Sequence, residues 1–433
     1  MDLYDKFNVK RGLRNADGTG VLVGLTRIGD VHGYDIIDGK KVAVDGKLFY
    51  RGYDVEDLVA AAEAEKRFGF EETVFLLLFG TLPGKEQLKD FCDFMGSSRA
   101  LPKNFAEDSI MKLPSRDIMN KLARSVLTLY SYDETPEDRS PENVLRQCLA
   151  LISRFPTIVA YSYMAKKHYF DHESLIIHMP DKNVSAAESI LALIRSDQQY
   201  SRLEAEILDM ALVLHAEHGG GNNSTFAVHV VTSSDTDTFS AIAAGLGSLK
   251  GYKHGGANFK VMQMMDDIKK NVKKWDDEGE VADYLELMLR KKAGDGSGLI
   301  YGQGHAVYTI SDPRAWLLRD KAALLAEEKG LKDEFNLYRV IERLAPLVFK
   351  KVKGSDKAIC TNVDFYSGFV YRMLGIPSEL YTALFATSRV SGWCAHLLEE
   401  IIAGGRIIRP AYKCVQDRLK YVPLTERGYS SVN

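Results

Sequence analysis

The sequence predicts a mainly α-helical (all-α) protein with a small β-hairpin region near its N-terminus. Three observations support this fold class. Helical apolar periodicity with recognisable caps runs from residue 54 onward, strand-like alternation is confined to residues 19–53, and no fixed-period repeat or low-complexity linker interrupts the chain. With 433 residues and 45% apolar content, the chain is long enough to bury a substantial core.

The strand-like region lies between Thr19 and Tyr53, where valine, leucine and aromatic residues alternate with polar ones. It contains two Asp-Gly pairs, Asp38-Gly39 and Asp45-Gly46. Asp-Gly is a strong signal for a two-residue hairpin turn, because both residues tolerate a positive φ. We therefore expect a short hairpin at each pair.

The helices are predicted from their ends as much as from their periodicity. Asp54 caps DVEDLVAAAEAEKR, EETVFLLLF ends at Gly80, and Asp312-Pro313 begins a helix that ends at Gly330. Other helical stretches are predicted at 86–96, 115–131, 141–153, 185–196, 201–216 and 237–250. The last is rich in alanine and glycine, so it predicts either a tightly packed core helix or a subunit interface.

Composition and charge exclude several classes of protein. The 56 basic and 59 acidic residues give a formal net charge of -3, which offers no general attraction to nucleic acid or to a membrane surface. The longest apolar run, Val74 to Phe79, is too short to span a bilayer, and the N-terminus lacks the apolar core of a secretory signal. The five cysteines are scattered without CxxC spacing, which favours a reducing compartment. We expect a cytoplasmic protein.

Four polar clusters separated by ordinary helix are the candidates for chemistry. They are LHAEHGGGNNS (214–224), GYKHGGAN (251–258), GQGHAVYTISDPR (302–314) and CTNVDFYSG (360–368), and three arginines follow at Arg389, Arg406 and Arg409. Each cluster alone has an ordinary interpretation as a loop, a helix cap or a solvated charge. Three clusters that each pair histidine with glycine make a functional site the better interpretation.

Other catalytic motifs fit poorly. The HAEH run at 215–218 has two histidines at i and i+3, but it lacks the HExxH order and any nearby cysteine, so we predict no metal site. HGGG is similar to the oxyanion segment of lipases, yet the chain has no GxSxG nucleophile motif. Neither GxxxxGK[ST] nor GxGxxG occurs, so nucleotide phosphates have no standard binding loop.

Taken together, the clusters resemble the citrate synthase family in their order, separations and residue types. The resemblance runs from KLFYRGYDVEDL (47–58) to RIIRPAY (406–412) and includes EETVFLLLFG and PDKNVSAAESILAL. It implies a citrate-synthase-like two-domain fold, with a large helical domain at 1–255 and 370–433 and a small domain at 256–369. It also implies a homodimer with shared active sites, in which oxaloacetate and acetyl-CoA are the substrates.

The resemblance assigns residues to roles. It implies that His254, His305 and Asp364 are catalytic. It implies that the dicarboxylate is bound by His218, Asn222, Arg314, Arg389 and Arg409, together with His305, and that the last arginine comes from the partner subunit. Contacts with CoA are implied for Lys253, Leu299, Ile300, Tyr301, Gly302 and Gly304.

The chemistry of these residue types agrees with the assignment. The methyl group of acetyl-CoA is a very weak acid, so a base such as Asp364 must remove its proton while a donor stabilises the enol oxygen. His254 precedes a predicted helix, whose dipole disfavours the protonated imidazole, and we expect Gly255 and Gly256 to let the substrate approach. His305 would protonate the ketone oxygen, and arginine forks match the carboxylates of oxaloacetate. We expect no metal and no cofactor, since acetyl-CoA is a substrate.

Several positions depart from the family pattern. Tyr252-Lys253 stands where many members have Pro-Leu, Gly219 where Glu is frequent, and Thr309 where some members place a basic residue. Contacts with CoA are therefore rearranged, with Lys253 as a substitute.

Three alternatives stay open at this point. They are 2-methylcitrate synthase acting on propionyl-CoA, a non-catalytic CoA-binding relative, and a metal hydrolase that uses HAEH. One methylene in a pocket changes binding by only about 1–3 kcal/mol, so motifs do not decide between the two acyl groups.

Overall fold

The computed structural model describes residues 3–15, 18–354 and 358–428. The chain divides into two compact units, a larger one formed by Gly24–Arg406 and a smaller one that joins the two ends of the chain, Met1–Val23 and Ile407–Asn433. Every sequence cluster named above lies in the larger unit. Arg409 lies in the smaller one.

The smaller unit contains little regular structure. It has a short helix, α1 (Leu3–Lys6), two 3-10 turns, η1 (Arg11–Leu13) and η5 (Leu424–Glu426), and an isolated bridge between Arg14 and Gly20. Within this unit the Lys413 ammonium lies 5.6 Å from the centre of the Phe7 ring. Large apolar side chains of its C-terminal stretch are exposed, among them Tyr412 at 94%.

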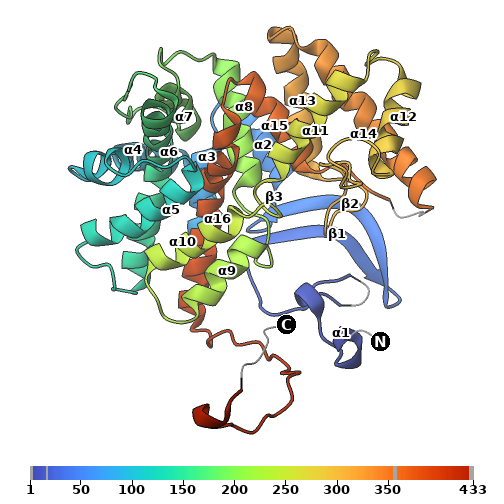
Figure 1. Ribbon diagram of the computed structural model, residues 1–433. Helices are drawn as coiled ribbons and strands as arrows, with labels where there is room; N and C mark the ends of the chain where they lie inside the picture. The colour runs from blue at the N-terminus through green and yellow to red at the C-terminus, as the bar shows by residue number, and fades with distance from the viewer. Residues whose placement is uncertain (1–2, 16–17, 355–357, 429–433) are drawn as a thin grey trace. The chain divides into compact units, whose positions relative to one another are not determined.

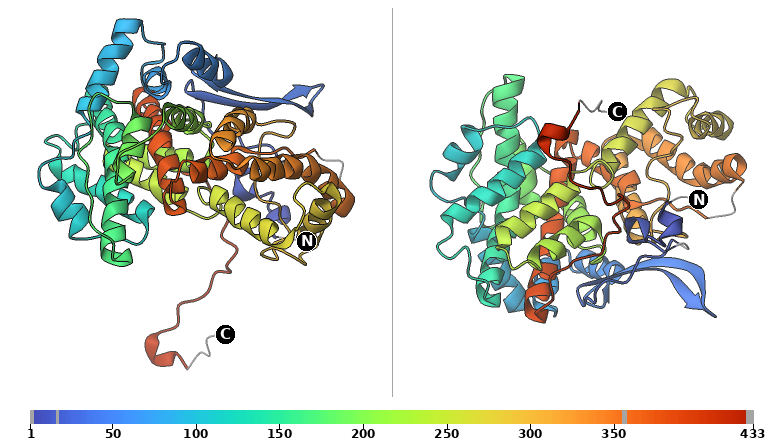
Figure 2. Two further views of the ribbon diagram at one scale, coloured as in Figure 1. Left: turned by 90° about the horizontal axis from the view of Figure 1, so that it is seen from above. Right: turned by 60° about the horizontal axis from the view of Figure 1, so that its bottom comes forward.

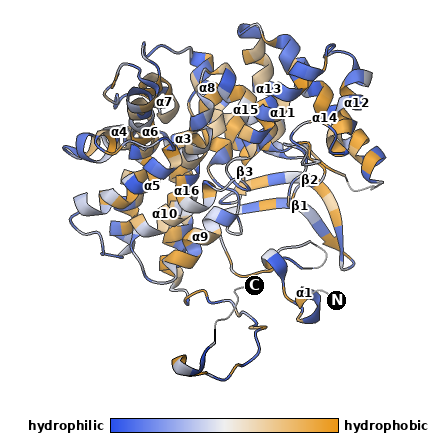
Figure 3. Cartoon of the chain, in the orientation of Figure 1, coloured by the Kyte–Doolittle hydropathy of each residue, from blue (hydrophilic) through white to orange (hydrophobic). Residues whose placement is uncertain are grey.

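The larger unit begins with a small antiparallel sheet of order β1-β2-β3, made of β1 (Gly29–Ile37), β2 (Lys40–Tyr50) and β3 (Tyr53–Asp54). Strands β1 and β2 form one long hairpin (Figures 1 and 2), and hydrophobic and hydrophilic residues alternate along them (Figure 3). The predicted turn at Asp38-Gly39 is confirmed, since Ile37 pairs with Lys40 and both turn residues have positive φ, 52° and 71°.

The second predicted hairpin, at Asp45-Gly46, is wrong. Both residues lie inside β2, opposite the place where the pairing register shifts between His32 and Tyr34. Gly46 is needed there for a different reason. A Cβ on Gly46 would lie 2.1 Å from the Ser311 carbonyl oxygen and 2.6 Å from the Tyr308 ring.

The rest of the larger unit is helical, which confirms the predicted fold class. The helices are α2 (Val55–Ala64), α3 (Phe70–Phe79), α4 (Lys85–Ser97), η2 (Ala106–Met111), α5 (Ile118–Leu129), η3 (Tyr130–Tyr132), α6 (Pro141–Asp171), α7 (Ala186–Ile194), α8 (Arg202–His215), α9 (Asn223–Thr232), α10 (Thr238–Leu249), α11 (Ala257–Asn271), α12 (Glu278–Leu289), α13 (Pro313–Glu328), α14 (Lys332–Lys353), α15 (Val363–Met373), η4 (Ser378–Leu380) and α16 (Tyr381–Ala403).

The predicted caps are present. The Asp54 carboxylate accepts the N–H of Glu56, the Asp312 carboxylate accepts the N–H of Arg314, and Gly80 ends α3 in the left-handed conformation.

Helix α6 is longer than the stretch predicted at 141–153, because it continues through Pro156 to Asp171. Proline removes one backbone hydrogen bond, but the residues around it are almost all buried, and their packing outweighs the loss. Among the described residues α6 is the one helix long and apolar enough to cross a membrane, yet 89% of its apolar window is buried inside the protein.

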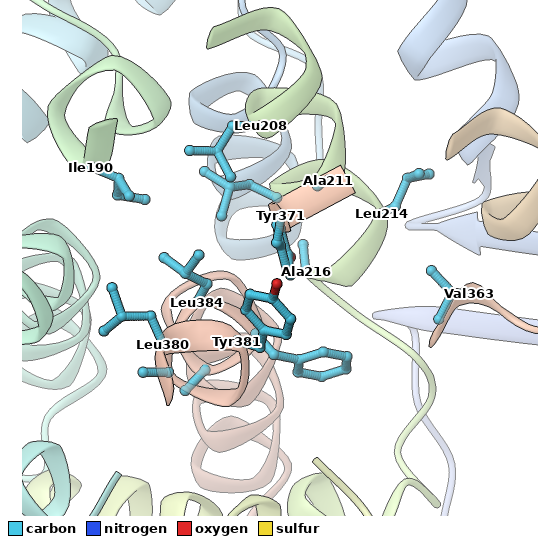
Figure 4. Close-up of a cluster of buried hydrophobic side chains, with 14 of the residues drawn as sticks. Ile190, Leu208, Ala211, Leu214, Ala216, Val363, Tyr371, Leu380, Tyr381 and Leu384 are labelled. Carbon is cyan, nitrogen blue, oxygen red and sulfur yellow. The ribbon is translucent and has the colours of Figure 1, made fainter. Parts of the chain in front are cut away.

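Helix α16 packs on both α6 and α10, and all three contribute buried side chains to the core. A Cβ on Gly245 of α10 would lie 2.9 Å from Val228 and 3.2 Å from Trp393, so glycine allows the close approach that the sequence indicated. Figure 4 shows one part of this core, where Leu208 of α8 lies near Tyr371 of α15 and Leu384 of α16. The buried side chains beside the candidate site therefore come from several helices.

Helices α11 to α15 pack mainly on one another, and α13 and α15 also contact α8 (Figure 1). This grouping overlaps the predicted small domain at 256–369. The predicted boundary at 369–370 falls inside α15. The division into a large and a small domain stays a prediction.

Candidate functional site

Backbone hydrogen bonds connect the segment that carries His305 to the residues just before α15. Gln303 forms an isolated β-bridge with Thr361, the Gly304 N–H donates to the Cys360 carbonyl at 2.6 Å, and the Asn362 N–H donates to the Gly302 carbonyl at 2.9 Å. Residue 302 has φ +79°, and a Cβ there would lie 2.7 Å from the Phe365 ring. Only glycine fits, so the loop that carries His305 lies against the start of α15, the helix that carries Asp364.

His305 has a defined tautomer in this loop. Its Nδ1 accepts the backbone N–H groups of Val307 at 3.1 Å and Tyr308 at 3.0 Å. A nitrogen that accepts carries no proton, so the neutral ring holds its proton on Nε2. The ring stacks on Tyr308 with centroids 4.7 Å apart, and it meets His218 edge-to-face at 5.2 Å.

His254 lies two residues before the N-cap of α11, as predicted. Its Nε2 is 2.9 Å from the Ser224 hydroxyl, which also accepts the indole N–H of Trp393 at 3.2 Å. Burial, reinforced by the positive charge of Arg389, lowers the pKa of His254 to about 4. The imidazole is therefore neutral at pH 7.

The expected reason for the glycines after His254 needs correction. A Cβ on Gly255 would lie 2.3 Å from the Leu249 carbonyl oxygen and 2.7 Å from Thr382. A Cβ on Gly256 would lie 3.3 Å from the Cα of Tyr252. The chain packs tightly against itself here, and this packing accounts for Gly255 without a substrate.

Asp364 lies in the first turn of α15, which is capped by the Asn362 side chain. Burial raises the pKa of Asp364 to about 6, with Arg314 and Arg389 opposing the shift and Asp312 adding to it. In the part of the chain that the structure describes, no hydrogen bond reaches this carboxylate. A carboxylate with this pKa is a stronger base than an ordinary one and is still mostly ionised at pH 7.

Arg389 is a buried cation on α16, with only 1% of its surface exposed. Its Nε donates to the His215 carbonyl at 2.7 Å, while its Nη1 has no partner among the described residues. Burial lowers the pKa of Arg389 to about 10, so the group remains charged at pH 7. A buried cation with an unpaired donor is suited to bind an anion, which would accept a hydrogen bond from that donor.

Arg314 is equally buried, but most of its guanidinium is already paired. Its Nε and Nη2 donate to the Asp312 carboxylate at 3.0 and 2.8 Å. Burial lowers the pKa of Arg314, and the ion pair with Asp312 outweighs this effect, so the net shift is upward. Because Asp312 also accepts the N–H of Val363 at 3.3 Å, it links the starts of α13 and α15.

His218 completes this group. Its Nε2 is buried without a partner in the described chain. Burial, followed by the charges of Arg314, His305 and Arg389, holds the pKa of His218 well below its usual value. Neutral imidazoles therefore stand beside two buried guanidiniums.

The remaining predicted residues are less closely tied to this cluster. Asn222 is the N-cap residue of α9 and accepts the Ser224 hydroxyl at 3.0 Å. Leu299 is exposed, Ile300 is buried, and Tyr301 donates to Asp295 at 2.6 Å. Lys253 is exposed beside His254. Arg409 and its neighbours belong to the smaller unit, where the Arg409 side chain is exposed.

The HAEH run gives no support to a metal site. Both ring nitrogens of His215 are buried without a partner in the described chain, and the ring packs on Phe385 at 4.5 Å. No group of three or more His, Cys, Asp or Glu side chains in the described ranges is arranged to hold a metal ion. The pair lacks the further ligands that a metal ion needs.

Four residues near the site were not singled out from the sequence: Ser224, Tyr308, Trp393 and Glu217. Three of them stand inside or beside the histidine clusters, so their positions alone offered a weak signal. Trp393 offered none, because it is separated from Ser224 by 169 residues and meets it only through the packing of α16. Glu217 is fully buried and bonds to His396 at 3.0 Å.

Comparisons with known proteins agree with one another. A family model described as citrate synthase, C-terminal domain, matches residues 16–411. The citrate synthase of Haloferax volcanii is 33% identical over 425 residues, which are 97% of this chain and 99% of that protein. The 2-methylcitrate synthase of Shewanella oneidensis is 32% identical and covers 89% of this chain and 94% of its own.

Two solved structures are similar over nearly the whole chain. The citrate synthase of Pyrobaculum aerophilum has a TM-score of 0.76 and 29% identity, covering 94% of each chain. The ternary complex of carboxymethyl coenzyme A and oxaloacetate with citrate synthase from Thermoplasma acidophilum has a TM-score of 0.77 and 26% identity. It covers 97% of this chain and 99% of its own.

Proposed function

This chain belongs to the citrate synthase family, and from that premise we propose that it condenses acetyl-CoA with oxaloacetate and hydrolyses citryl-CoA to citrate and CoA. One observation carries the proposal. Arg389 Nη1 and His218 Nε2 are buried without a partner in the described chain, and the His218 ring lies edge-to-face against His305 at 5.2 Å. Buried donors left unpaired are costly unless a ligand pairs them, and a carboxylate with a neighbouring ketone supplies the matching acceptors.

Oxaloacetate is bound in this proposal by His218, His305, Asn222, Arg314, Arg389 and Arg409. Arg389 supplies its unpaired Nη1 to one carboxylate, and Arg314 adds charge while Asp312 fixes its orientation. Arginine suits this role because the flat guanidinium matches a carboxylate with paired hydrogen bonds. His305, with its proton on Nε2, donates to the ketone oxygen and makes the carbonyl carbon more electrophilic.

The condensation divides the proton transfers among three residues. Asp364 takes a proton from the methyl group of acetyl-CoA, and the electron pair moves into the enol. His254, which is neutral at pH 7, donates a ring N–H to the thioester oxygen and stabilises the developing enol. The enol carbon then attacks the ketone carbon of oxaloacetate, whose oxygen receives the proton of His305. Water finally cleaves the citryl thioester to citrate and CoA.

CoA is bound in this proposal by Lys253 and by the segment Leu299, Ile300, Tyr301, Gly302 and Gly304. The exposed Lys253 ammonium suits a phosphate, and Leu299, at 55% exposure, offers an apolar contact. The segment precedes His305, so the bound thioester is directed toward the catalytic residues.

We further propose a cytoplasmic homodimer with shared active sites, in which Arg409 reaches the site of the partner subunit. A two-domain chain with a small domain at 256–369 would close over the substrates and exclude water. The exposed apolar side chains of the C-terminal stretch, such as Tyr412, support a role in contacts with a second copy. We propose that the reaction needs no metal or other cofactor and that the protein has no nucleic-acid or membrane partner.

The direct test measures thiol release from acetyl-CoA with and without oxaloacetate. We expect release only with oxaloacetate, no change on adding a chelator, and near loss of activity in Asp364→Asn with an unchanged circular dichroism spectrum. CoA binding without product would instead identify a non-catalytic relative. Loss of activity with a chelator would identify a metal enzyme.

Propionyl-CoA is the second candidate acyl donor, because a relative named 2-methylcitrate synthase is 34% identical over 396 residues. The two reactions need the same acid and base groups, and the acyl pocket differs by one methylene. Comparing kcat/KM for acetyl-CoA and propionyl-CoA decides between them. A higher value for propionyl-CoA would reassign the substrate and leave the rest of the mechanism unchanged.

A further inference from the structure

Tyr308 contacts three of the residues placed in the site. Its ring stacks on His305 with centroids 4.7 Å apart and planes inclined by 26°, and it meets His218 edge-to-face at 5.7 Å. The Arg314 guanidinium lies 5.8 Å from the ring centre. The side chain is 1% exposed, so these contacts occur away from water.

The β1–β2 hairpin fixes Tyr308 from the other side. The Tyr308 hydroxyl donates to the Lys47 carbonyl at 3.2 Å. One residue earlier, the Gly46 N–H donates to the Ser311 hydroxyl at 3.0 Å, and this hydroxyl in turn donates to Asp45 at 3.0 Å. The hairpin therefore holds the loop 305–311 by three hydrogen bonds, although more than 250 residues separate the two segments.

Two glycines allow the hairpin to approach so closely. A Cβ on Gly46 would meet the Ser311 carbonyl oxygen and the Tyr308 ring, and a Cβ on Gly33 would lie 2.9 Å from the Val307 carbonyl oxygen. Strands β1 and β2 thus both contact the loop closely at glycine positions. Close packing of the hairpin on the loop would need the two glycines but not the three hydrogen bonds. Having both at one place restricts the loop 305–311 to one geometry.

We propose that Tyr308, held by the β1–β2 hairpin, is a positioning residue that sets the orientation of His305 for catalysis. The inference rests on the proposed function of His305. The backbone N–H groups of Val307 and Tyr308 fix the tautomer of the imidazole, and the stacked ring fixes its tilt. Moving the Tyr308 ring would therefore misdirect the Nε2–H without changing any group that reacts.

The test compares Tyr308→Leu, Tyr308→Phe and Gly46→Ala with the parent enzyme. Tyr308→Leu removes the stacked ring, Tyr308→Phe keeps the ring and removes only the bond to Lys47, and Gly46→Ala displaces the ring without altering it. Two control variants match these changes elsewhere. Tyr161→Leu removes a buried tyrosine that also donates to a backbone carbonyl, at 2.9 Å, and Gly84→Ala adds a Cβ with no atom within 4 Å.

Two readouts are measured on each variant. The first is kcat and KM for oxaloacetate. The second is the NMR signal of the His305 ring C–H in protein labelled at histidine, assigned by its loss in His305→Gln. A ring stacked face to face shifts this signal upfield, so the signal reports the Tyr308–His305 contact whether or not the enzyme turns over.

We expect Tyr308→Leu and Gly46→Ala to lower kcat by about 10- to 100-fold and to move the His305 signal downfield. Tyr308→Phe should retain most of the activity and the signal, and both controls should leave kcat within about twofold. The proposal is overturned if Tyr308→Leu and Gly46→Ala leave the His305 signal in place, or if they lower kcat no more than Tyr161→Leu. An inactive parent enzyme would instead refute the proposed function, and the NMR signal would still decide whether Tyr308 holds His305.

Discussion

At the scale of single residues, one physical cause separates the acid and base groups of the site. Burial disfavours charge, so it raises the pKa of Asp364 to about 6 and lowers the pKa of His254 to about 4. At pH 7 the carboxylate is mostly ionised and able to accept a proton, while the imidazole is neutral and able to donate a hydrogen bond. Burial is the largest cause of both shifts, and the charge of Arg389 adds to the shift of His254.

The raised pKa of Asp364 predicts an acidic limit to activity. Because the base must be ionised, kcat/KM should fall as the pH drops through about 6. His254 stays neutral down to about pH 4, so its protonation should lower kcat/KM further only below that pH. The pH profile of the oxaloacetate-dependent thiol release measures this. A profile that stays flat down to pH 4 would contradict the assignment of Asp364 as the base.

The same shift predicts that Asp364→Asn makes the protein more stable. The folded pKa of this carboxyl lies above its ordinary value of 3.8. Its ionisation therefore does not lower the free energy of unfolding below pH 3.8, and lowers it increasingly as the pH rises through about 6. The substitution should therefore raise the free energy of unfolding by roughly 1–3 kcal/mol at pH 7 and by almost nothing at pH 4. Thermal or urea unfolding at the two pH values checks this. Equal effects at both would show that Asp364 is not destabilised by burial.

At the scale of elements, the helix ends were the most predictable part of the fold. Asp54, Gly80 and Asp312 act as the sequence indicated, because capping is a local interaction between neighbours in the chain. The errors arose where a distant contact decides the outcome. Pro156 is tolerated inside α6 because the helix is buried, and Gly46 lies inside β2 because Tyr308 and Ser311 pack against it.

The site shows the same division between local and distant effects. Local clusters and the family resemblance pointed to His254, His305, Asp364 and the arginines. The residues that contact them could not be predicted from the sequence. Ser224 contacts both His254, which is 30 residues away in the chain, and Trp393, which is 169 residues away. Nothing in the spacing of the sequence records such contacts, since they depend on how α9, α11 and α16 pack.

Gly302 provides a test of how one element positions another. Gly302→Ala should be strongly damaging, because the residue has φ +79° and the new Cβ would lie 2.7 Å from Phe365. We expect a loss of stability of about 1–3 kcal/mol and a fall in kcat, as His305 is pushed away from the start of α15. Urea unfolding and steady-state kinetics measure the two effects.

Gly296→Ala is the matched control for that variant. Gly296 lies earlier in the same glycine-rich loop with φ +72°, but its new Cβ would have no atom within 4 Å. Both variants carry the cost of a positive φ, about 1–2 kcal/mol, so the difference between them isolates the contact with Phe365. If both variants lose the same activity, the close approach to α15 has no role in placing His305.

At the scale of the whole molecule, the candidate site gathers residues from α8 and α9, the start of α11, the loop before α13, the start of α15 and the middle of α16. All of these belong to the unit Gly24–Arg406. Arg409 is the exception, since it belongs to the unit formed by the two ends of the chain. Whether this arginine serves its own chain or a second copy is the question on which the proposed shared site depends.

Mixed dimers of two inactive variants answer that question. Asp364→Asn removes the proposed base, and Arg409→Gln removes the proposed cross-subunit cation, so each homodimer should be nearly inactive. In a dimer with one chain of each kind, a shared site would combine Asp364 of the Arg409→Gln chain with Arg409 of the Asp364→Asn chain. One of the two sites is then complete, and such dimers should regain about half of the parent kcat per dimer.

The two chains would be produced together with different affinity tags and purified in sequence, so that only mixed dimers are assayed. If Arg409 acts within its own chain, every site lacks one of the two groups and the mixed dimer should remain as inactive as its parents. The matched control pairs Asp364→Asn with Arg406→Gln, a change of charge three residues earlier at a position given no role in the site. Because the outcome depends only on which chain supplies each group, it separates a shared site from a self-contained one without a structure of the assembled dimer.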